Sequence, residues 1–264
     1  MPPAADFDIM EQQLVQYLEQ LWYEGESKGY AADALSGVQH FLNSRRRFAG
    51  AWQLLTTWSR LEIPCRAPPF TLPIVLALAG IAWSERLYDI AALLLTGFHC
   101  CLRTGEILNL RYTDISLDVT GRGAISLPWT KIGQQRGVRE VVTIDEGLVG
   151  LALILGRADR DPTSLYLACS PAVFRSFLQQ SLQKLHLGSC NFQAYSLRRG
   201  GATHHYLQHQ NVQTTMIRGR WSDVRTARLY LTDGQAALTS LHLATEAARA
   251  IAYHSDYLCR ELNK

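Results

Sequence analysis

The sequence predicts a mainly α-helical protein with a small β-hairpin, built from a small helical N-terminal domain and a larger mixed α+β domain. Apolar residues recur at helical spacing over most of the 264 residues, which is the pattern of amphipathic helices. Four prolines interrupt this pattern within residues 62–73 and indicate an extended linker. Two β-rich runs flank the turn GQQRG within residues 122–144 and predict the hairpin. Because the domain boundary falls in the linker, we expect domains at residues 1–66 and 67–264.

The N-terminal domain is expected to hold three helices. The first spans about residues 8–27 and ends at a turn that contains Gly29, the second spans about 31–44, and the third about 48–61. Their apolar residues recur at intervals of three and four, so the helices can bury a common core.

The larger domain is expected to begin with helices at about 72–83 and 86–101 and a third that starts near Arg103. The hairpin strands follow at 124–130 and 138–144, and the chain from Asp145 onward is mainly helical. Its last helix is expected over 234–258, where an apolar stripe gathers several residues that can pack on their own domain: Leu238, Leu241, Ala244, Ala248 and Ile251.

Composition argues against several classes of protein. Apolar residues make up 47% of the chain and charged residues 19%, values typical of a folded core and not of disorder. No apolar run reaches the ~18–20 residues of a membrane-spanning helix, and the N-terminus lacks the pattern of a secretory signal. The six cysteines form no CxxC pair and no ligand spacing with histidine, so we expect reduced structural thiols and no metal site.

The net charge of +3 hides a strong asymmetry along the chain. Residues 1–40 carry seven acidic side chains and one lysine, whereas residues 41–66 carry five arginines against one glutamate and residues 191–230 carry six arginines against one aspartate. Such local positive charge indicates a polyanionic partner, and a solvated basic face is the alternative. Only four of the 26 basic residues are lysines. Arginine suits bidentate phosphate contacts, although codon or lineage bias would give the same ratio.

Two of the arginines occupy positions that favour the binding of an anion. Arg103 directly follows the apolar run 90–102 and lies one helical turn before Glu106. This pair is either a surface ion pair or a buried arginine that a carboxylate holds ready for an anion. Arg198 lies near the start of the predicted helix AYSLRRGGATHHYLQH, where the main-chain N–H groups and the helix dipole also favour an anion.

Other residues of that helix have two readings each. Gly200 and Gly201 allow either a close approach of the backbone to a ligand or close helix packing. Among His204, His205 and His209 only the last two share a helix face. No cysteine or carboxylate completes a ligand set, so we interpret all three histidines as surface or ligand-facing residues.

Lys131 and the segment RGRWSDVRTARLYLTDG complete the pattern. Lys131 lies on the hairpin just before its turn, where it is either a catalytic group or a solvated strand-end lysine. Trp221 follows Arg198 by 23 residues and precedes Tyr230 by 9. In this order and at these intervals the residues resemble the tyrosine recombinase (phage integrase) family of site-specific recombinases. TGFHCCLRTGEILNLRYTDI is similar to the box of the first arginine, WTKIGQQRGVREVVTI to the hairpin of the catalytic lysine, and YSLRRGGAT and GRWSDVRTARLY to the remaining boxes.

The resemblance covers nearly the whole chain and implies a role for each matching residue. Tyr230 would attack the scissile phosphate and form a 3′-phosphotyrosine, while Lys131 protonates the leaving 5′-oxygen. Arg103 and Arg198 would hold the non-bridging oxygens, Trp221 would donate its indole N–H to the phosphate, and Glu106 would support the first arginine. The ester conserves the energy of the broken bond, so no metal and no nucleotide cofactor is expected.

The resemblance also implies partners and a location. Double-stranded DNA would be the substrate, clamped between a helical core-binding domain at 1–66 and a catalytic domain at 67–264. The N-terminal domain has three clear helices where the family usually has four or five. The C-terminal helix would dock on a neighbouring protomer in a homotetramer, and the protein would lie in the nucleus or nucleoid. The residues expected to contact DNA outside the catalytic centre are Arg45, Arg46, Arg47, Arg199 and Arg220.

The chain departs from the family at two positions of the second box. Tyr195 stands where histidine is most common, and Arg199 stands where a second histidine is common. Tyrosine has an ordinary pKa of about 10 and is a poorer base than imidazole at neutral pH, although it can orient the nucleophile. Two other functions are therefore open: a type IB topoisomerase-like enzyme with the same chemistry, and a domesticated recombinase that binds DNA without cutting it.

Overall fold

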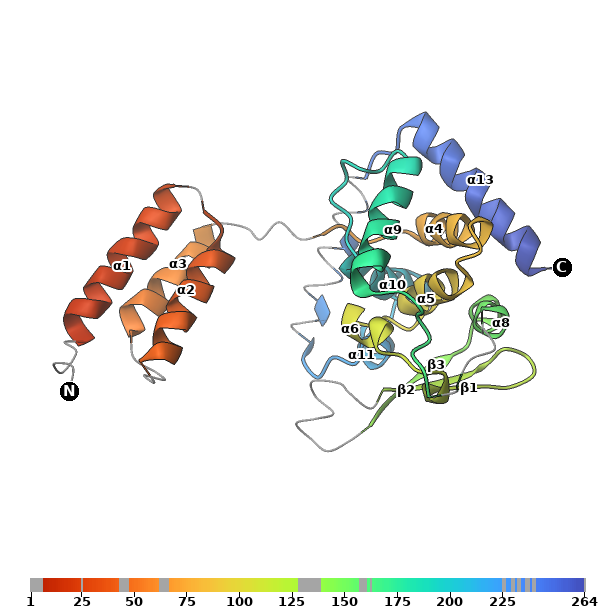
Figure 1. Cartoon of the computed structure of the whole chain (residues 1–264), viewed down its shortest axis with the longest axis horizontal. Coiled ribbons are helices and arrows are strands. Elements are labelled where there is room, and N and C mark those ends of the chain that lie inside the picture. The colour runs from red at the N-terminus through yellow and green to blue at the C-terminus, as the bar shows by residue number, and fades with distance from the viewer. Residues whose placement is uncertain are drawn as a thin grey trace. The chain divides into compact units, whose positions relative to one another are not determined.

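The computed structural model divides into two compact units, residues 1–66 and 67–264 (Figure 1). It describes residues 7–24, 26–42, 48–61, 67–127, 139–156, 161, 163–224, 227–228, 231, 234–235, 238 and 241–263. The structure confirms the predicted fold class, because most described residues are helical and the second unit holds one small antiparallel sheet.

The first unit is a bundle of α1 (Phe7–Tyr23), α2 (Lys28–Phe41) and α3 (Ala49–Leu61). Its core contains Trp58, whose ring stacks on that of Trp22 with 5.9 Å between centroids. The predicted break at Gly29 is wrong, because Ser27 caps α2 by accepting a hydrogen bond from the main-chain N–H of Tyr30 and thereby starts the helix before the glycine. The buried residues of this unit are Leu18, Leu21, Ala31, Leu35, Phe48, Ala51, Leu55 and Trp58.

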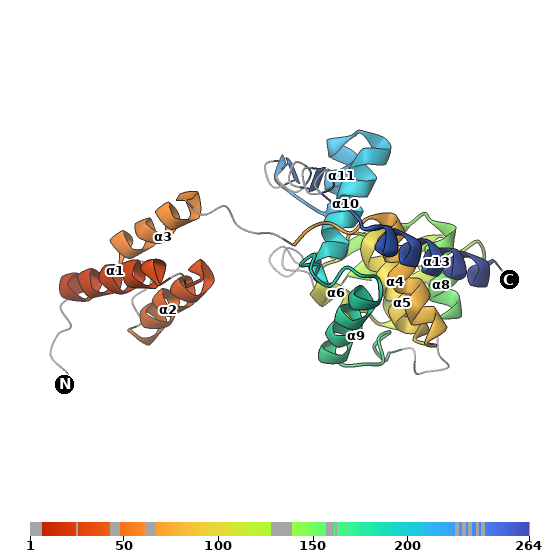
Figure 2. The same cartoon turned by 90° about the horizontal axis from the view of Figure 1, so that it is seen from above.

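The second unit is organised around two apolar helices, α4 (Leu72–Ser84) and α5 (Tyr88–His99), which lie side by side and are buried over most of their length. Around them pack α8 (Gly147–Leu155), α9 (Pro171–Lys184), α10 (Tyr195–His209) and α13 (Thr245–Leu262). Two shorter helices complete the description, α6 (Thr104–Leu108) and α11 (Val212–Gly219). Figures 1 and 2 show α4 and α5 enclosed by these elements.

The sheet has three antiparallel strands in the order β1 (Ile115–Leu117), β2 (Gly123–Leu127) and β3 (Glu140–Ile144). The antiparallel pairing of β2 with β3 confirms the predicted hairpin, whose turn GQQRG lies outside the described residues, and Leu127 pairs with Glu140 next to that connecting segment. Strand β1 was not predicted, since three residues are too few to show a two-residue alternation. It follows a short 3₁₀ turn, Tyr112–Asp114.

The prediction that all of residues 62–73 form a linker is wrong for its second half. Residues 67–71 are extended but belong to the second unit, where the side chain of Phe70 is 1% exposed. The N–H of Phe70 donates to the carbonyl of Ser196 at 3.1 Å, and its ring stacks on Phe192 at 4.6 Å. Pro73 lies in the first turn of α4, a position where a missing N–H costs nothing.

The C-terminal helix also differs from the prediction of a helix over 234–258. Helix α13 begins at Thr245, after four non-helical residues, and of the predicted stripe only Ile251 is buried. It packs along α4 of the same chain (Figure 2), and the contact is so close that a Cβ on Gly80 would lie 2.1 Å from the carbonyl oxygen of His254. The self-packing interpretation is thus the one that the structure supports. The buried residues of this helix are Ala247, Ile251, Leu258 and Leu262.

Candidate active site

Arg103 lies where the chain turns from the buried helix α5 into α6. It is the N-cap of α6, and the carboxylate of Glu106 accepts its main-chain N–H and its Nη1 at 2.7 Å each. The Glu106 side chain is 6% exposed, whereas that of Arg103 is 33% exposed. A buried carboxylate therefore holds one edge of the Arg103 guanidinium and leaves part of the side chain accessible, as the functional interpretation of this pair requires.

Arg198 lies on the first turn of α10 and is only 2% exposed. Its Nη1 donates to the carbonyl of Cys101 and its Nη2 to the carbonyl of Gly219, both at 2.6 Å. Among the described residues it contacts no carboxylate. Burial, followed by the positive charges of Arg103 and Arg220, lowers the pKa of Arg198. A cation held by carbonyls and crowded by other cations favours the arrival of an anion.

Trp221 covers this arginine from the end of α11. The Cζ of Arg198 lies 5.2 Å from the centroid of the indole, within the range of a cation–π contact. A Cβ on Gly219 would lie 2.4 Å from the same ring, so the residue before the turn has to be glycine for the ring to fold back. Arg220, at φ +55° and ψ +47°, forms the left-handed turn that places Trp221 there.

Three segments far apart in the sequence thus bring together Arg103, Arg198 and Trp221. The segments are the α5–α6 junction, the start of α10 and the end of α11. Three guanidinium groups, those of Arg103, Arg198 and Arg220, are gathered near two carboxylates, those of Glu106 and Glu140. The site therefore carries an excess of positive charge and can accept an anion such as a phosphodiester.

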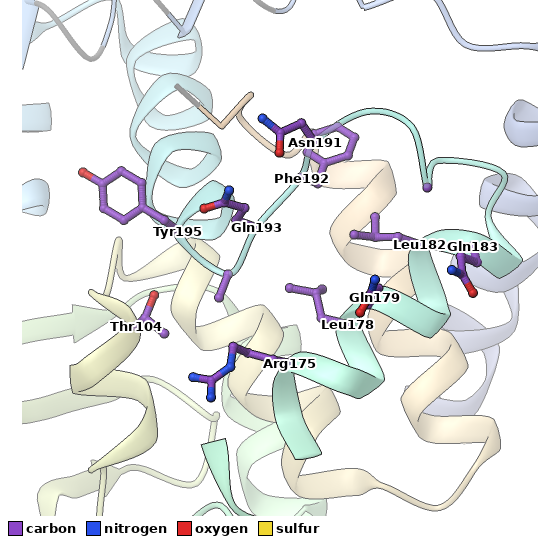
Figure 3. A pocket seen from close by; sticks show the side chains of 12 residues that line it. Thr104, Arg175, Leu178, Gln179, Leu182, Gln183, Asn191, Phe192, Gln193 and Tyr195 are labelled. Carbon is purple, nitrogen blue, oxygen red and sulfur yellow. The ribbon is translucent and has the colours of Figure 1, made fainter. Parts of the chain in front are cut away.

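Tyr195 is the first residue of α10 and lies at the edge of a cavity of about 490 Å³. Figure 3 shows its hydroxyl pointing away from the leucines of α9 that line the other side. Thr104, the neighbour of Arg103, lines the same cavity, together with the polar residues Gln179 and Gln193. The cavity therefore adjoins the residues of the candidate site and has both polar and apolar side chains in its lining.

Two residues predicted to contact DNA are internal instead. Arg199 is 2% exposed and its Nη1 donates to the carbonyl of Ala67 at 2.6 Å, which ties the residues before α4 to α10. The side chain of Arg220 is 6% exposed and pairs with the carboxylates of Glu106 and Glu140. DNA contact by Arg199 and Arg220 stays a prediction, but both side chains bond inside the second unit. Sequence alone does not tell an arginine on a surface from one that bonds to carbonyls or carboxylates inside.

Five of the predicted residues lie outside the described part of the chain: Lys131, Tyr230, Arg45, Arg46 and Arg47. The strands that flank the segment of Lys131 are described, and Leu127 of β2 faces Glu140 of β3 where that segment begins and ends. Glu140 is a site residue that the sequence analysis missed, since a glutamate at the start of a strand gives no signal without the position of Arg220.

The glycines after Arg199 serve helix packing. A Cβ on Gly200 would lie 2.2 Å from the carbonyl oxygen of Phe70, and a Cβ on Gly201 would lie 1.8 Å from that of Phe98. Real Cβ atoms do not approach backbone this closely, so α10 can pass the α5 backbone only with glycine at position 201. Of the two readings, close packing is the one that the structure supports.

A second cavity, of about 620 Å³, lies beside α10 on the side of its histidines. His205 and His209 share a face, as predicted, with ring centroids 4.4 Å apart. His99 contacts Asp145 at 2.5 Å, and Asp145 accepts two hydrogen bonds from Arg218 at 2.6 Å each. Burial by itself disfavours the charged carboxylate, but the hydrogen bonds and charge of Arg218, with His99, outweigh it and lower the pKa of Asp145 to about 2.

Within the described part of the chain, no group of three or more histidine, cysteine or acidic side chains is placed to hold a metal ion. None of the helices described there combines the length and the apolar character of a membrane span. The described cysteines are free, and burial raises the pKa of Cys100 to about 12 and that of Cys101 to about 11.

No protein-family model and no curated protein matches the sequence. Solved structures do match the fold. The XerH site-specific recombinase bound to palindromic difH substrate superimposes with a TM-score of 0.59 at 14% identity, over 90% of this chain and 71% of that one. The Tn1549 transposon integrase in complex with transposon right end DNA gives a TM-score of 0.56 at 14% identity, over 91% and 83%. The same integrase with circular intermediate DNA gives 0.54 at 15% identity, over 92% and 84%. The chain is therefore similar in fold to site-specific recombinases and transposon integrases.

Proposed function

We propose that this protein is a site-specific DNA recombinase that cuts and rejoins DNA strands through a 3′-phosphotyrosine intermediate. The observation that carries the proposal is the convergence of Arg103, Arg198 and Trp221 in one positively charged site, on a fold shared with recombinases that were solved with DNA. The order and spacing of Lys131 and Tyr230 in the sequence supply the remaining groups.

In the proposed reaction the phenolic oxygen of Tyr230 attacks the scissile phosphorus and the bond from phosphorus to the 5′-oxygen breaks. Lys131 gives a proton to the departing 5′-oxygen, and the phenolic proton of Tyr230 passes to solvent water. The hydroxyl of Tyr195, which stands where the family has histidine, would accept a hydrogen bond that orients Tyr230. A 5′-hydroxyl of the partner strand then reverses the step and frees the tyrosine. No bond energy is lost, so the reaction runs without a nucleotide cofactor.

The arginines stabilise charge on the phosphate in this reaction. Arg103 and Arg198 hold the non-bridging oxygens as negative charge grows on them, and the indole N–H of Trp221 donates a further hydrogen bond. Glu106 keeps the Arg103 guanidinium in place. Because carbonyls and not carboxylates hold Arg198, its charge is not cancelled before DNA arrives.

Double-stranded DNA is the proposed partner, clamped by the two units, with Arg45, Arg46 and Arg47 as phosphate contacts on the first. Acting on DNA would place the protein in the nucleus or nucleoid. Strand exchange between two duplexes needs four copies on DNA. Since the apolar face of α13 is already covered by its own chain, a neighbour would meet the outward face of this helix, where Tyr253 is 65% exposed.

The test is a covalent trapping assay with a library of randomised DNA duplexes, each nicked near the randomised region so that the released piece diffuses away. The native protein should form a DNA adduct that survives denaturation. Tyr230→Phe should abolish the adduct, whereas the control Tyr23→Phe, an exposed tyrosine at the end of α1, should retain it.

The outcomes separate the alternatives. An adduct that depends on Tyr230, followed by exchange of strands between two duplexes, supports the recombinase. An adduct with relaxation of supercoiled plasmid and no exchange would indicate a topoisomerase-like enzyme. DNA binding with no adduct on any duplex of the library would refute catalysis and leave a DNA-binding relic.

A further inference from the structure

Arg220 occupies a backbone position that is unusual for a residue with a side chain. It ends α11 in the left-handed region, at φ +55° and ψ +47°, where glycine is the common residue after a helix. This backbone conformation is less favourable for an arginine than for a glycine. The contacts of the Arg220 side chain therefore bear on why an arginine occupies the position.

The side chain of Arg220 bridges two buried carboxylates from different elements. Its Nη2 donates to Oε2 of Glu106 at 2.5 Å, and its Nε lies 3.3 Å from Oε2 of Glu140 on β3. Exposed fractions are 6% for the side chains of Arg220 and Glu106 and 17% for that of Glu140. The contacts are therefore shielded from water, where removing one partner leaves an uncompensated buried charge.

Glu106 is the point at which this bridge reaches the candidate site. Its Oε1 accepts from Nη1 of Arg103, while its Oε2 accepts from the main-chain N–H of Arg103 and from Arg220. A continuous chain of contacts thus runs from Glu140 through Arg220 and Glu106 to the guanidinium of Arg103. Removing Arg220 would take away the one contact, among the described residues, that holds the carboxylate of Glu106 from outside its own turn, and would leave only the main-chain N–H and Nη1 of Arg103 on it.

The other end of the bridge lies at the first residue of β3, next to the segment that connects β2 and β3. Glu140 pairs with Leu127 across β2 and β3, and Lys131 lies in the segment between these two residues. Arg220 therefore connects the turn that carries Arg103 with the first residue of β3, the strand that follows the segment of Lys131.

We infer that Arg220 is a positioning residue that orients Arg103 through Glu106 and fixes, through Glu140, the start of β3, the strand that follows the segment of Lys131. The inference rests on the proposed function and deepens it. Arg220 would not itself be a phosphate ligand, because two carboxylates already pair with its guanidinium, whereas main-chain carbonyls hold that of Arg198.

The experiment compares Arg220→Gln with Arg249→Gln, an exposed arginine on α13, in the trapping assay and in DNA-binding titrations. Arg220→Gln should slow adduct formation by about 10- to 100-fold, the range found when a group that orients a catalytic ligand is removed, and should leave the Kd for DNA within about 3-fold. Arg249→Gln should match the native protein in both. Arg220→Lys, which keeps one charge, should recover part of the rate.

A double-mutant cycle with Glu106→Gln distinguishes positioning from direct contact. If Arg220 acts through Glu106, adding Arg220→Gln to Glu106→Gln should cost less than about 3-fold more. A full additional loss of rate in the double variant, or a native rate in Arg220→Gln, would overturn the inference. Neither result would affect the proposed function, which rests on the adduct of the native protein.

Hydrogen exchange gives a readout that is independent of cleavage. Amides of residues 103–108 and 140–144 should exchange faster in Arg220→Gln than in the native protein or in Arg249→Gln. Unchanged exchange in both segments would overturn the inference. If the native protein forms no adduct at all, the proposed function fails, and the exchange measurement alone decides whether Arg220 holds the turn of Arg103.

Discussion

The guanidinium of Arg198 and the indole of Trp221 form one unit, with 5.2 Å between Cζ and the ring centroid. Gly219 joins them, since its carbonyl accepts from Arg198 at 2.6 Å and its missing side chain makes room for the ring. A ligand that reaches Arg198 therefore meets the indole as well, which gives Trp221 two roles that substitutions can separate.

Trp221→Phe should keep the ring over Arg198 and lose the indole N–H. If that N–H donates to the phosphate in the transition state, the trapping rate should fall by about 100-fold, as for the loss of one donor to a developing oxyanion, with little change in DNA affinity. Trp221→Ala should also lose the cation–π contact, worth about 0.5–2 kcal/mol. Trp52→Phe in the first unit is the control, and a native rate for Trp221→Phe would contradict the donor role.

Tyr195→His tests the main departure from the family pattern. Tyr195 lies at the edge of the cavity beside Thr104, so imidazole can occupy this place without repacking a core. If proton removal from Tyr230 limits cleavage, the rate should rise, and its pH profile should shift to follow a group of pKa near ~6.5. A slower or unchanged rate would show that Tyr195 orients the nucleophile through its hydroxyl and is not a weak substitute for a base.

The sequence predicts the helices well and the site in part, for reasons that particular residues show. Helices α4 and α5 and the hairpin carry strong local patterns, and Arg103, Arg198 and Trp221 stand at intervals typical of a family. The partners of Arg199 and Arg220 could not be predicted, because a main-chain carbonyl at Ala67 and a carboxylate at Glu140 leave no mark near either arginine. The start of α13 was missed because Leu238 and Leu241 continue its apolar spacing before the helix begins.

Gly201→Ala should destabilise the second unit without removing any group of the candidate active site. The new Cβ would lie 1.8 Å from the carbonyl oxygen of Phe98, and two helix backbones cannot separate locally without opening the core. We expect a loss of about 1–3 kcal/mol in the free energy of unfolding, measured in urea. Gly105→Ala, where no atom lies within 4 Å of the new Cβ, is the control. If Gly201 served DNA approach instead, stability would be kept and DNA affinity would fall.

Acid should destabilise the protein through the histidines of the second cavity. Burial lowers the pKa of His99 and His204 and lowers that of His205 to about 4, with Arg218 and His209 acting in the same direction on His205 and Asp145 opposing them. The unfolded chain binds these protons near pH ~6.5, more tightly than the folded chain. The contribution of these histidines to the free energy of unfolding should thus be fully present above that pH, and stability should fall as the pH drops toward about 4.

Urea midpoints between pH 7.5 and 4.5 measure this effect. His205→Gln retains a partner for Thr215, which His205 contacts at 2.9 Å, and should flatten the profile. His186→Gln, exposed after α9, should leave the slope unchanged. A native midpoint that stays constant over this range would contradict the assignment of buried neutral histidines.

Leu258→Ala tests whether α13 stabilises its own chain or serves a neighbour. Leu258 is fully buried on the face of α13 that covers α4, where Gly80 brings the two backbones together. Its truncation should lower the free energy of unfolding by about 2–5 kcal/mol at protein concentrations where the chain is monomeric. Tyr253→Ser, on the outward face, should leave monomer stability intact and weaken any association on DNA. If Leu258→Ala instead kept the stability of the monomer and reduced only association, the packing of α13 on α4 would not represent the free protein, and exchange of this helix between protomers would be the better description.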